Sequence, residues 1–141
     1  MASVIPNSVK KAIVDEWVGQ DLRLMLLNDL FFPYPALIVN VGQSDILSRR
    51  VPATGGYPAD GVPLTGLVQS YDGNNVFLDA NDISIGPNAT LAYRYGCVYS
   101  YNAMGLSVSP VLCIIDFVTN QIVTNGTSTI LWNTLGIIYV S

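Results

Sequence analysis

The chain contains no histidine at all and few charged residues of either sign. Histidine is the commonest general base and a frequent zinc ligand, so its absence excludes Ser–His and Cys–His catalysis and histidine-containing zinc sites. Only 11% of the residues carry a charge, whereas about 25% is usual for a soluble domain. Six basic residues stand against ten acidic ones, which is not the basic patch that phosphate neutralisation requires. We therefore expect no direct contact with nucleic acid.

Long apolar runs are also missing. A membrane-spanning helix needs about 20 consecutive apolar residues, and the longest candidates, 36–39, 111–115 and 136–140, are far shorter. Residues 1–7 do not place an apolar stretch after a basic region, as a secretory signal does. The two cysteines are too few for a disulfide-rich scaffold. We expect a chain that does not enter a membrane and whose thiols stay reduced.

The carboxylates form no catalytic or metal-binding pattern. They are scattered along the chain, and the glycines do not make a phosphate-binding motif before a helix. The stretch 79–82 offers oxygen atoms to a calcium ion, but it lacks the spacing of an EF-hand loop, and a turn explains the same residues. We expect the chain not to be an enzyme and to hold no cofactor or metal.

What the chain has in quantity is apolar residues. Half of its 141 residues are hydrophobic, and the mean hydropathy is +0.42. The length favours a single domain, 1–141. Because no membrane segment absorbs this apolar content, we expect part of the surface to be covered by other protein molecules.

The N-terminal region predicts the one helix of the fold. Asn7 or Ser8 can cap a helix over 7–19, and apolar residues recur within it at helical spacing. The helix is short, so its stability should come from docking Ile13 and Trp17 onto the rest of the chain.

A strand and a long loop follow the helix. The leucine-rich run 21–29 predicts a strand, with Leu22, Leu24 and Leu26 on one face. Glycine and proline are dense over 52–66, which predicts an extended loop or arm. Its apolar, uncharged composition favours an arm that lies across a neighbouring molecule over a flexible linker.

The region 67–141 is predicted to form the main β-sheet. The expected strands are 67–71, 76–78, 83–85, 89–101, 110–118, 128–132 and 135–140. Turn residues gather at 72–75 and 86–88. Short strands at this spacing are typical of an antiparallel β-sandwich or barrel. The fold class is therefore mainly β, with one short N-terminal helix and a long Gly/Pro-rich loop.

The strand 89–101 places four tyrosines on one face: Tyr93, Tyr95, Tyr99 and Tyr101. Such a face is most often core or protein interface, and less often a platform on which sugars stack.

The two cysteines are predicted to meet. If 89–101 and 110–118 form a hairpin centred on Gly105, Cys97 lies opposite Cys113 on one face. Packing as small hydrophobes is then favoured over a redox switch.

The C-terminal half carries short motifs in a fixed order. These are Asn88-Ala89-Thr90-Leu91-Ala92-Tyr93-Arg94-Tyr95, Ser109-Pro110-Val111-Leu112, Ile115-Asp116-Phe117, Asn125-Gly126-Thr127 and Ile130-Leu131-Trp132-Asn133-Thr134-Leu135-Gly136-Ile137-Ile138. Their order resembles a family of small virion structural proteins of tailed bacteriophages. The N-terminal half resembles the family loosely, and the stretch 31–40 departs from its pattern.

The resemblance implies a role on the virion. Its small members often act as capsid decoration or cement subunits, commonly as trimers, which implies the major capsid protein and further copies of this chain as partners. It also implies assembly in the host cytoplasm and a final location on the capsid surface. The alternative is a tail- or fibre-associated subunit with a receptor-binding role. Aromatic residues dominate interface energetics, so the predicted interface residues are Trp17, Phe31, Phe32, Tyr34 and Tyr57.

Overall fold

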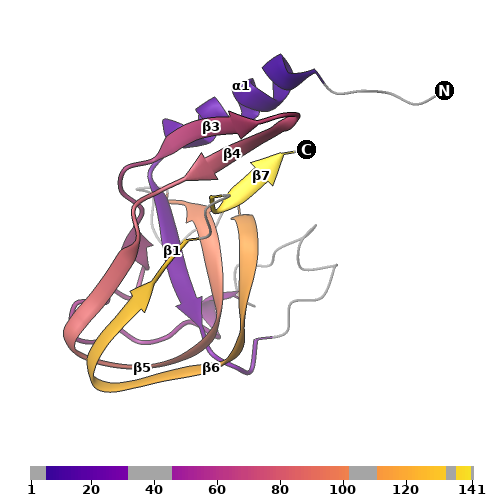
Figure 1. Cartoon of the computed structure of the whole chain (residues 1–141). Helices are drawn as coiled ribbons and strands as arrows, with labels where there is room; N and C mark the ends of the chain where they lie inside the picture. Colours follow the sequence, from indigo (N-terminus) through magenta and orange to yellow (C-terminus); the bar gives the residue numbers. More distant parts are fainter. Residues whose placement is uncertain (1–5, 32–45, 102–110, 133–135, 141) are drawn as a thin grey trace.

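Two antiparallel sheets and an N-terminal helix make up most of the structure that the described residues form. The computed structural model describes residues 6–31, 46–101, 111–132 and 136–140. Within them the elements are α1 (Asn7–Val18), β1 (Leu22–Leu27), β2 (Val62–Pro63), β3 (Val68–Asp72), β4 (Asn75–Asp79), β5 (Ile83–Ser100), β6 (Val111–Ile130) and β7 (Ile138–Val140). One sheet has the strand order β2-β1-β5-β6 and the other β3-β4-β7 (Figure 1). The predicted class, mainly β and sandwich-like with one short N-terminal helix, is confirmed.

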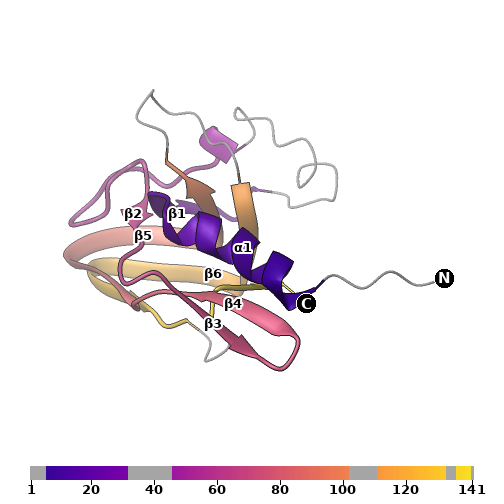
Figure 2. The ribbon, with the colours of Figure 1, turned by 90° about the horizontal axis from the view of Figure 1, so that it is seen from above.

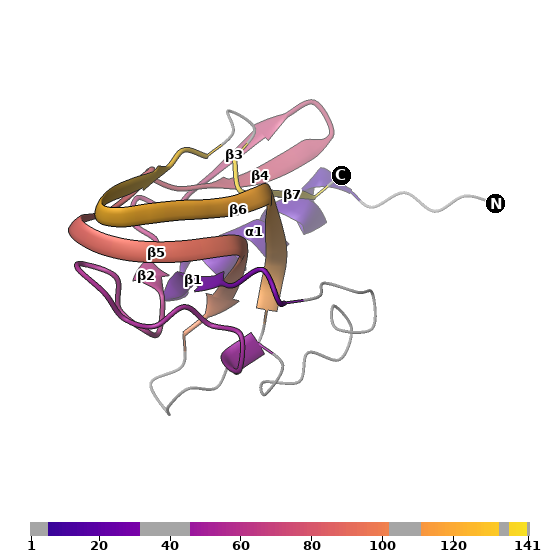
Figure 3. The same ribbon diagram turned by 90° about the horizontal axis from the view of Figure 1, so that it is seen from below.

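β5 and β6 form one long curved hairpin. They run side by side round the lower part of the molecule in Figure 1, and Figure 3 shows the pair from below. A turn was predicted at 86–88, but the strand continues there, and these three residues lie opposite Thr127 alone. The backbone is left-handed at Asn88, with a φ of 69°. Residues typical of turns here build a bulge, which bends a strand without ending it.

The predicted strands 110–118 and 128–132 are parts of β6 and not separate elements. The strand is continuous between them, with a φ of 75° at Val118 and 47° at Asn125. The register with β5 shifts near both residues. The prediction of separate strands was wrong because polar residues and glycine occupy bulges here.

Apolar side chains fill both faces of the four-stranded sheet. Core 1 lies between the two sheets and includes Leu22, Leu24 and Leu26 of β1 with Val76 and Leu78 of β4. Core 2 packs on other strand faces and contains Met25, Leu27, Phe31, Ile46, Tyr95, Cys97 and Tyr99. β1 is thus buried on both faces, which accounts for its continuous apolar sequence. The predicted division of its side chains between two faces is confirmed.

α1 packs on β4 and β3, as Figure 2 shows from above. Its buried residues are Lys10 and Val14, while Trp17 is partly buried against core 1. Ile13, which was predicted to dock, is 39% exposed. The side of α1 that docks is therefore the one that carries Lys10 and Val14, and not the adjacent side that carries Ile13. Lys10 is tolerated on it because its Nζ donates a hydrogen bond to the carbonyl oxygen of Asn74, at 2.8 Å.

The helix begins without a side-chain cap. Pro6 is the N-cap residue, and its carbonyl oxygen accepts a hydrogen bond from the Val9 amide at 3.0 Å. The Asn7 side chain instead donates to the carbonyl oxygen of Gly73, at 3.4 Å. The predicted cap at Asn7 or Ser8 is thus wrong, because tertiary contact with the β3–β4 turn takes the Asn7 side chain.

The segment 52–66 lies against the sheet of its own chain. The Leu64 amide donates to the carbonyl oxygen of Leu22 at 2.8 Å, and β2 pairs with β1. Gly61 has a φ of 94°, and a Cβ atom there would lie 2.6 Å from the Leu24 carbonyl oxygen. Only glycine allows so close an approach. The surface that this predicted arm lies across is therefore β1 of the same molecule.

Candidate protein-binding surface

Tyr57, a predicted interface residue, belongs to the core. It is 2% exposed, and its hydroxyl oxygen accepts a hydrogen bond from the Leu26 amide at 2.8 Å. Burial raises the pKa of Tyr57 to about 12. β2 pairs with β1 only at Arg23 and Leu24. The Tyr57 hydroxyl therefore accepts a hydrogen bond from a β1 amide that lies beyond the end of β2. Tyr57 has no surface to offer a partner, which corrects its assignment to an interface.

The other predicted aromatic anchors divide into three groups. Phe31 is buried in core 2, with its ring edge-on to Tyr95 at a centroid distance of 5.5 Å. Its assignment as a contact residue is corrected for the same reason. Trp17 is partly buried against core 1. Phe32 and Tyr34 lie outside the described residues.

The tyrosine-rich strand does not present a sugar-binding face. Tyr93, Tyr95 and Tyr99 are all buried. The register shift between Tyr93 and Tyr95 coincides with a change of surroundings: Tyr93 lies in core 1, and the next two tyrosines lie in core 2. Tyr93 is also hydrogen-bonded to the hydroxyl of Ser128 at 2.7 Å. The interpretation of these side chains as core is confirmed, and the platform is excluded for all three.

The two thiols point to opposite faces of the sheet. Tyr99 pairs with Val111, as the predicted hairpin requires, but a register shift follows and Cys113 pairs with Val98. Cys97 then lies opposite Ile114, in core 2, and Cys113 packs against core 1. A shift of one residue moves a side chain to the other face. The predicted Cys97–Cys113 pairing is therefore wrong.

The titratable groups form no active-site cluster in the described part of the chain. No three residues of the types His, Cys, Asp and Glu gather there to hold a metal ion. The carboxylates of 79–82 accept hydrogen bonds from backbone amides, one from a neighbouring residue and one from a residue far along the chain. Asp79 Oδ1 accepts from the Ala80 amide at 2.8 Å, and Asp82 Oδ1 from the Trp132 amide at 2.9 Å. Burial raises the pKa of Cys113 to about 12, which opposes formation of a reactive thiolate.

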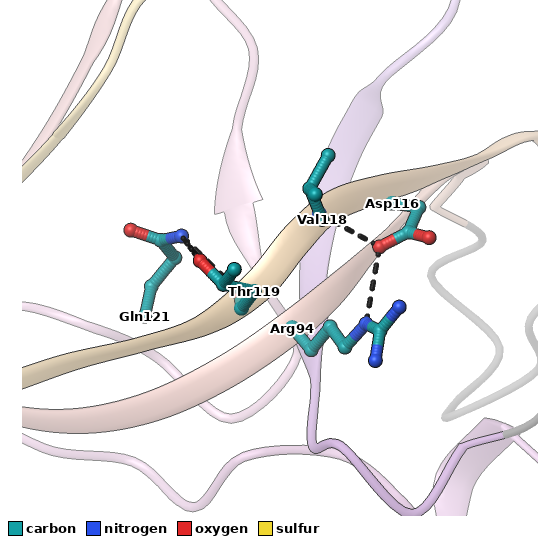
Figure 4. Close-up of polar contacts among 5 residues, drawn as sticks. All are labelled: Arg94, Asp116, Val118, Thr119 and Gln121. Atoms are coloured by element: carbon teal, nitrogen blue, oxygen red, sulfur yellow. Dashed lines mark hydrogen bonds and ion pairs between the residues drawn. The ribbon is translucent and has the colours of Figure 1, made fainter.

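One exposed ion pair links the two long strands, as Figure 4 shows. Arg94 Nε lies 3.3 Å from Asp116 Oδ1, which also accepts the Val118 amide at 2.8 Å. These two hydrogen bonds hold the pKa of Asp116 below its usual value. The pair sits beside the β6 bulge at Val118 and neutralises the charge of Asp116.

Beyond this pair the C-terminal third of the chain has no charge. Residues 95–141 contain a single charged residue, Asp116. Within this stretch Val118, Ile122 and Leu131 are 74%, 70% and 72% exposed. We define the β6 surface as Val118 and Ile122 with the uncharged strand between them. Sequence reasoning missed this surface because it placed a connection, and not a strand, after residue 118.

Further apolar side chains are exposed on other elements. Val9 and Ile13 lie on α1, Leu30 follows β1, and Val68 and Tyr71 lie on β3. Charge is sparse and apolar groups remain in water, so the arrangement suits burial against another protein surface.

The comparisons with known proteins identify no relative of the chain. No family model matches the chain, and neither a curated protein nor a solved structure matches it. Among the described residues there is no helix of the length and apolar character needed to cross a membrane.

Proposed function

We propose that the chain is a non-enzymatic structural subunit of a tailed-bacteriophage virion, which decorates and cements the capsid surface. The order of motifs from Asn88 to Ile138 supports this class of protein by resemblance. The observation that carries the physical argument is the stretch 95–141, whose single charged residue is the ion-paired Asp116, with its exposed β6 surface. A chain that leaves such side chains in water gains free energy when a partner covers them.

The mechanism is burial of protein surface across a shell. A subunit that binds the assembled shell and not its separated capsid proteins stabilises the shell by mass action. A contact of ordinary size, about 1,600 Å² in total, is enough for specific binding. The proposed partners are the major capsid protein and other copies of this chain, with the trimer as the arrangement that the resemblance implies. Val118 and Ile122 replace Phe31 and Tyr57 as the proposed contact residues, because they are exposed.

The test is binding of the purified chain to emptied capsids that lack it. We expect saturable binding at tens to hundreds of copies per shell, together with shells that resist higher temperature. Ile122→Lys places a charge on the β6 surface and should weaken binding by at least about tenfold, since a buried unpaired charge is costly. Thr65→Lys, at an exposed loop position away from β6, is the matched control and should bind normally. If the wild-type chain does not bind these capsids, the proposal is wrong.

The alternative is a tail- or fibre-associated subunit that binds a receptor. Of the four tyrosines that such a subunit would have offered to a sugar, Tyr93, Tyr95 and Tyr99 are buried and Tyr101 is half-buried, so the alternative needs another surface. It predicts a handful of copies at one vertex, and the same binding experiment separates it from a cement protein by stoichiometry.

A further inference from the structure

The free strand edges of the two sheets differ in how well they are protected. In the described part of the chain, β2 and β6 border one sheet, and β3 and β7 border the other. β2 has two residues, one of them Pro63, and β7 has three. β6 is long, but bulges break its register into short pieces. Proline, shortness and bulges are the devices by which proteins block pairing at an edge.

β3 has none of these protections. It pairs with β4 over five consecutive residues without a register shift, and its sequence contains neither lysine nor proline. Val68 and Tyr71 on this strand are 51% and 74% exposed. An unprotected regular edge with exposed apolar side chains is a template for an additional strand.

The outward backbone groups of β3 can be assigned from the hairpin. A two-residue turn joins β3 to β4, so the flanking residues Asp72 and Asn75 form the first hydrogen-bonded pair. Alternation along the strand then directs the backbone N–H and C=O of Tyr71 and Gln69 away from β4. These four groups are what a new neighbour would bind.

We propose that β3 pairs antiparallel with β3 of a second copy of this chain, about a two-fold axis at Ser70. In this register Gln69 of each copy lies opposite Tyr71 of the other, so every outward N–H and C=O of these two residues finds a partner. The two three-stranded sheets become one six-stranded sheet. Such an interface is self-complementary, as a two-fold contact requires.

The helix beside β3 supports a second copy as the occupant. An open cavity of about 310 Å³ lies beside the contact between α1 and the β3–β4 hairpin and is lined by Asn7, Ser8, Lys11, Gln69, Tyr71, Gly73 and Val76. Lys11 and Asp15 are exposed and lie one turn apart on α1. The two-fold axis sets the two α1 helices antiparallel on the same face of the joined sheet. Lys11 lines the cavity beside Gln69 and Tyr71, so the side of α1 that carries Lys11 and Asp15 lies next to β3. Antiparallel helices then bring opposite charges of the two copies towards each other.

The first test is the mass of the purified chain by light scattering, with no capsid present. We expect twice the chain mass of 15.2 kDa. Ser70→Lys puts two like charges across the axis and should weaken dimerisation by at least about tenfold, whereas Ser70→Thr should not. Ile122→Lys, on the protected edge, should leave the mass unchanged. A monomeric wild type, the trimer that the resemblance implies, or a dimer that is indifferent to Ser70→Lys overturns the proposal. Because capsids are not involved, failure here is separate from failure of shell binding.

The second test fixes the register. Facing residues of a non-hydrogen-bonded antiparallel pair have Cα atoms about 4.5 Å apart, a distance that a disulfide spans. Ser70→Cys should therefore give a covalent dimer on a non-reducing gel after mild oxidation with diamide. Ser84→Cys, an exposed position on β5, is the matched control and should stay monomeric on the gel. Cross-linking of both variants alike, or of neither, contradicts the proposed axis.

Discussion

Replacement of Tyr57 by phenylalanine tests the most unusual feature of the core. The hydroxyl of this side chain accepts the Leu26 amide hydrogen at 2.8 Å, with both groups buried. Tyr57→Phe keeps the ring and removes only the acceptor. The Leu26 N–H is then left without a partner inside the protein.

The cost follows from the unsatisfied donor. A buried polar group that loses its only partner costs about 1–3 kcal/mol, and the 2% exposure of Tyr57 leaves water little access. We expect a loss of about 2 kcal/mol in the free energy of unfolding. For a chain of this length that corresponds to a decrease of roughly 6 °C in melting temperature.

Urea unfolding followed by tryptophan fluorescence measures the effect. Both variants are compared in the Ser70→Lys background, so that dimerisation through β3, to which Tyr71 belongs, does not contribute. Tyr71→Phe is the matched control: it makes the same chemical change at a 74% exposed side chain, and stability should change by less than about 0.5 kcal/mol. If Tyr57→Phe is as neutral as Tyr71→Phe, the hydroxyl does not complete the β1 ladder and the reasoning is refuted.

The same residue predicts a dependence on pH. Burial raises the pKa of Tyr57 from 10.0 to about 12. The folded state therefore keeps the proton in a range where the unfolded chain loses it. The stabilisation by this group is complete below pH 10 and is lost as the pH rises from 10 towards 12. The stability difference between wild type and Tyr57→Phe should accordingly shrink above pH 10. A constant difference across this range would contradict the assigned burial.

Three further predictions concern other parts of the fold. Lys10→Met removes the donor to the carbonyl oxygen of Asn74 and should cost roughly 1.5 kcal/mol in urea unfolding, since charged hydrogen bonds contribute about that much; an unchanged midpoint would mean that the bond does not hold α1. Gly61→Ala should cost more than about 2 kcal/mol, and Gly73→Ala only about 1 kcal/mol, because an added Cβ meets a carbonyl oxygen at 2.6 Å in the first case and nothing within 4 Å in the second; equal costs would show that the close approach is absent. Both cysteines should resist alkylation in the folded chain and react after unfolding, since burial raises the pKa of each thiol; mass spectrometry would reveal rapid labelling or an internal disulfide, and either would contradict the separation of the thiols.

Residue patterns were most informative where burial is uniform along an element. The apolar residues of β1 alternate between two cores, so the apolar run predicted both the strand and its two faces. The β3–β4 hairpin was predicted from the turn residues near Gly73, whose φ of 58° suits glycine. These are local signals, and no distant contact overrides them.

The wrong predictions of strand ends share a physical cause. Glycine, proline and asparagine signal a left-handed or kinked backbone, and that signal is the same in a turn and in a bulge. The choice between the two depends on whether a partner strand continues alongside, as it does beside 86–88. A further register shift, between Val98 and Tyr99, turns Cys113 to the side opposite its predicted position, and no glycine, proline or asparagine stands at 98–99 or 111–113 to signal it. The buried Tyr57 was beyond sequence reasoning for another reason: its partner, the Leu26 amide, lies 31 residues away.

The proposal that the chain is a cement subunit is tested most directly by the copy number of the chain in purified virions of the tailed phage that, on this proposal, encodes it. Quantitative mass spectrometry against the major capsid protein gives this ratio without any assumption about the contact surface. A cement subunit predicts tens to hundreds of copies per virion, in fixed proportion to the capsid protein. Absence from virions, or a handful of copies, would contradict the account.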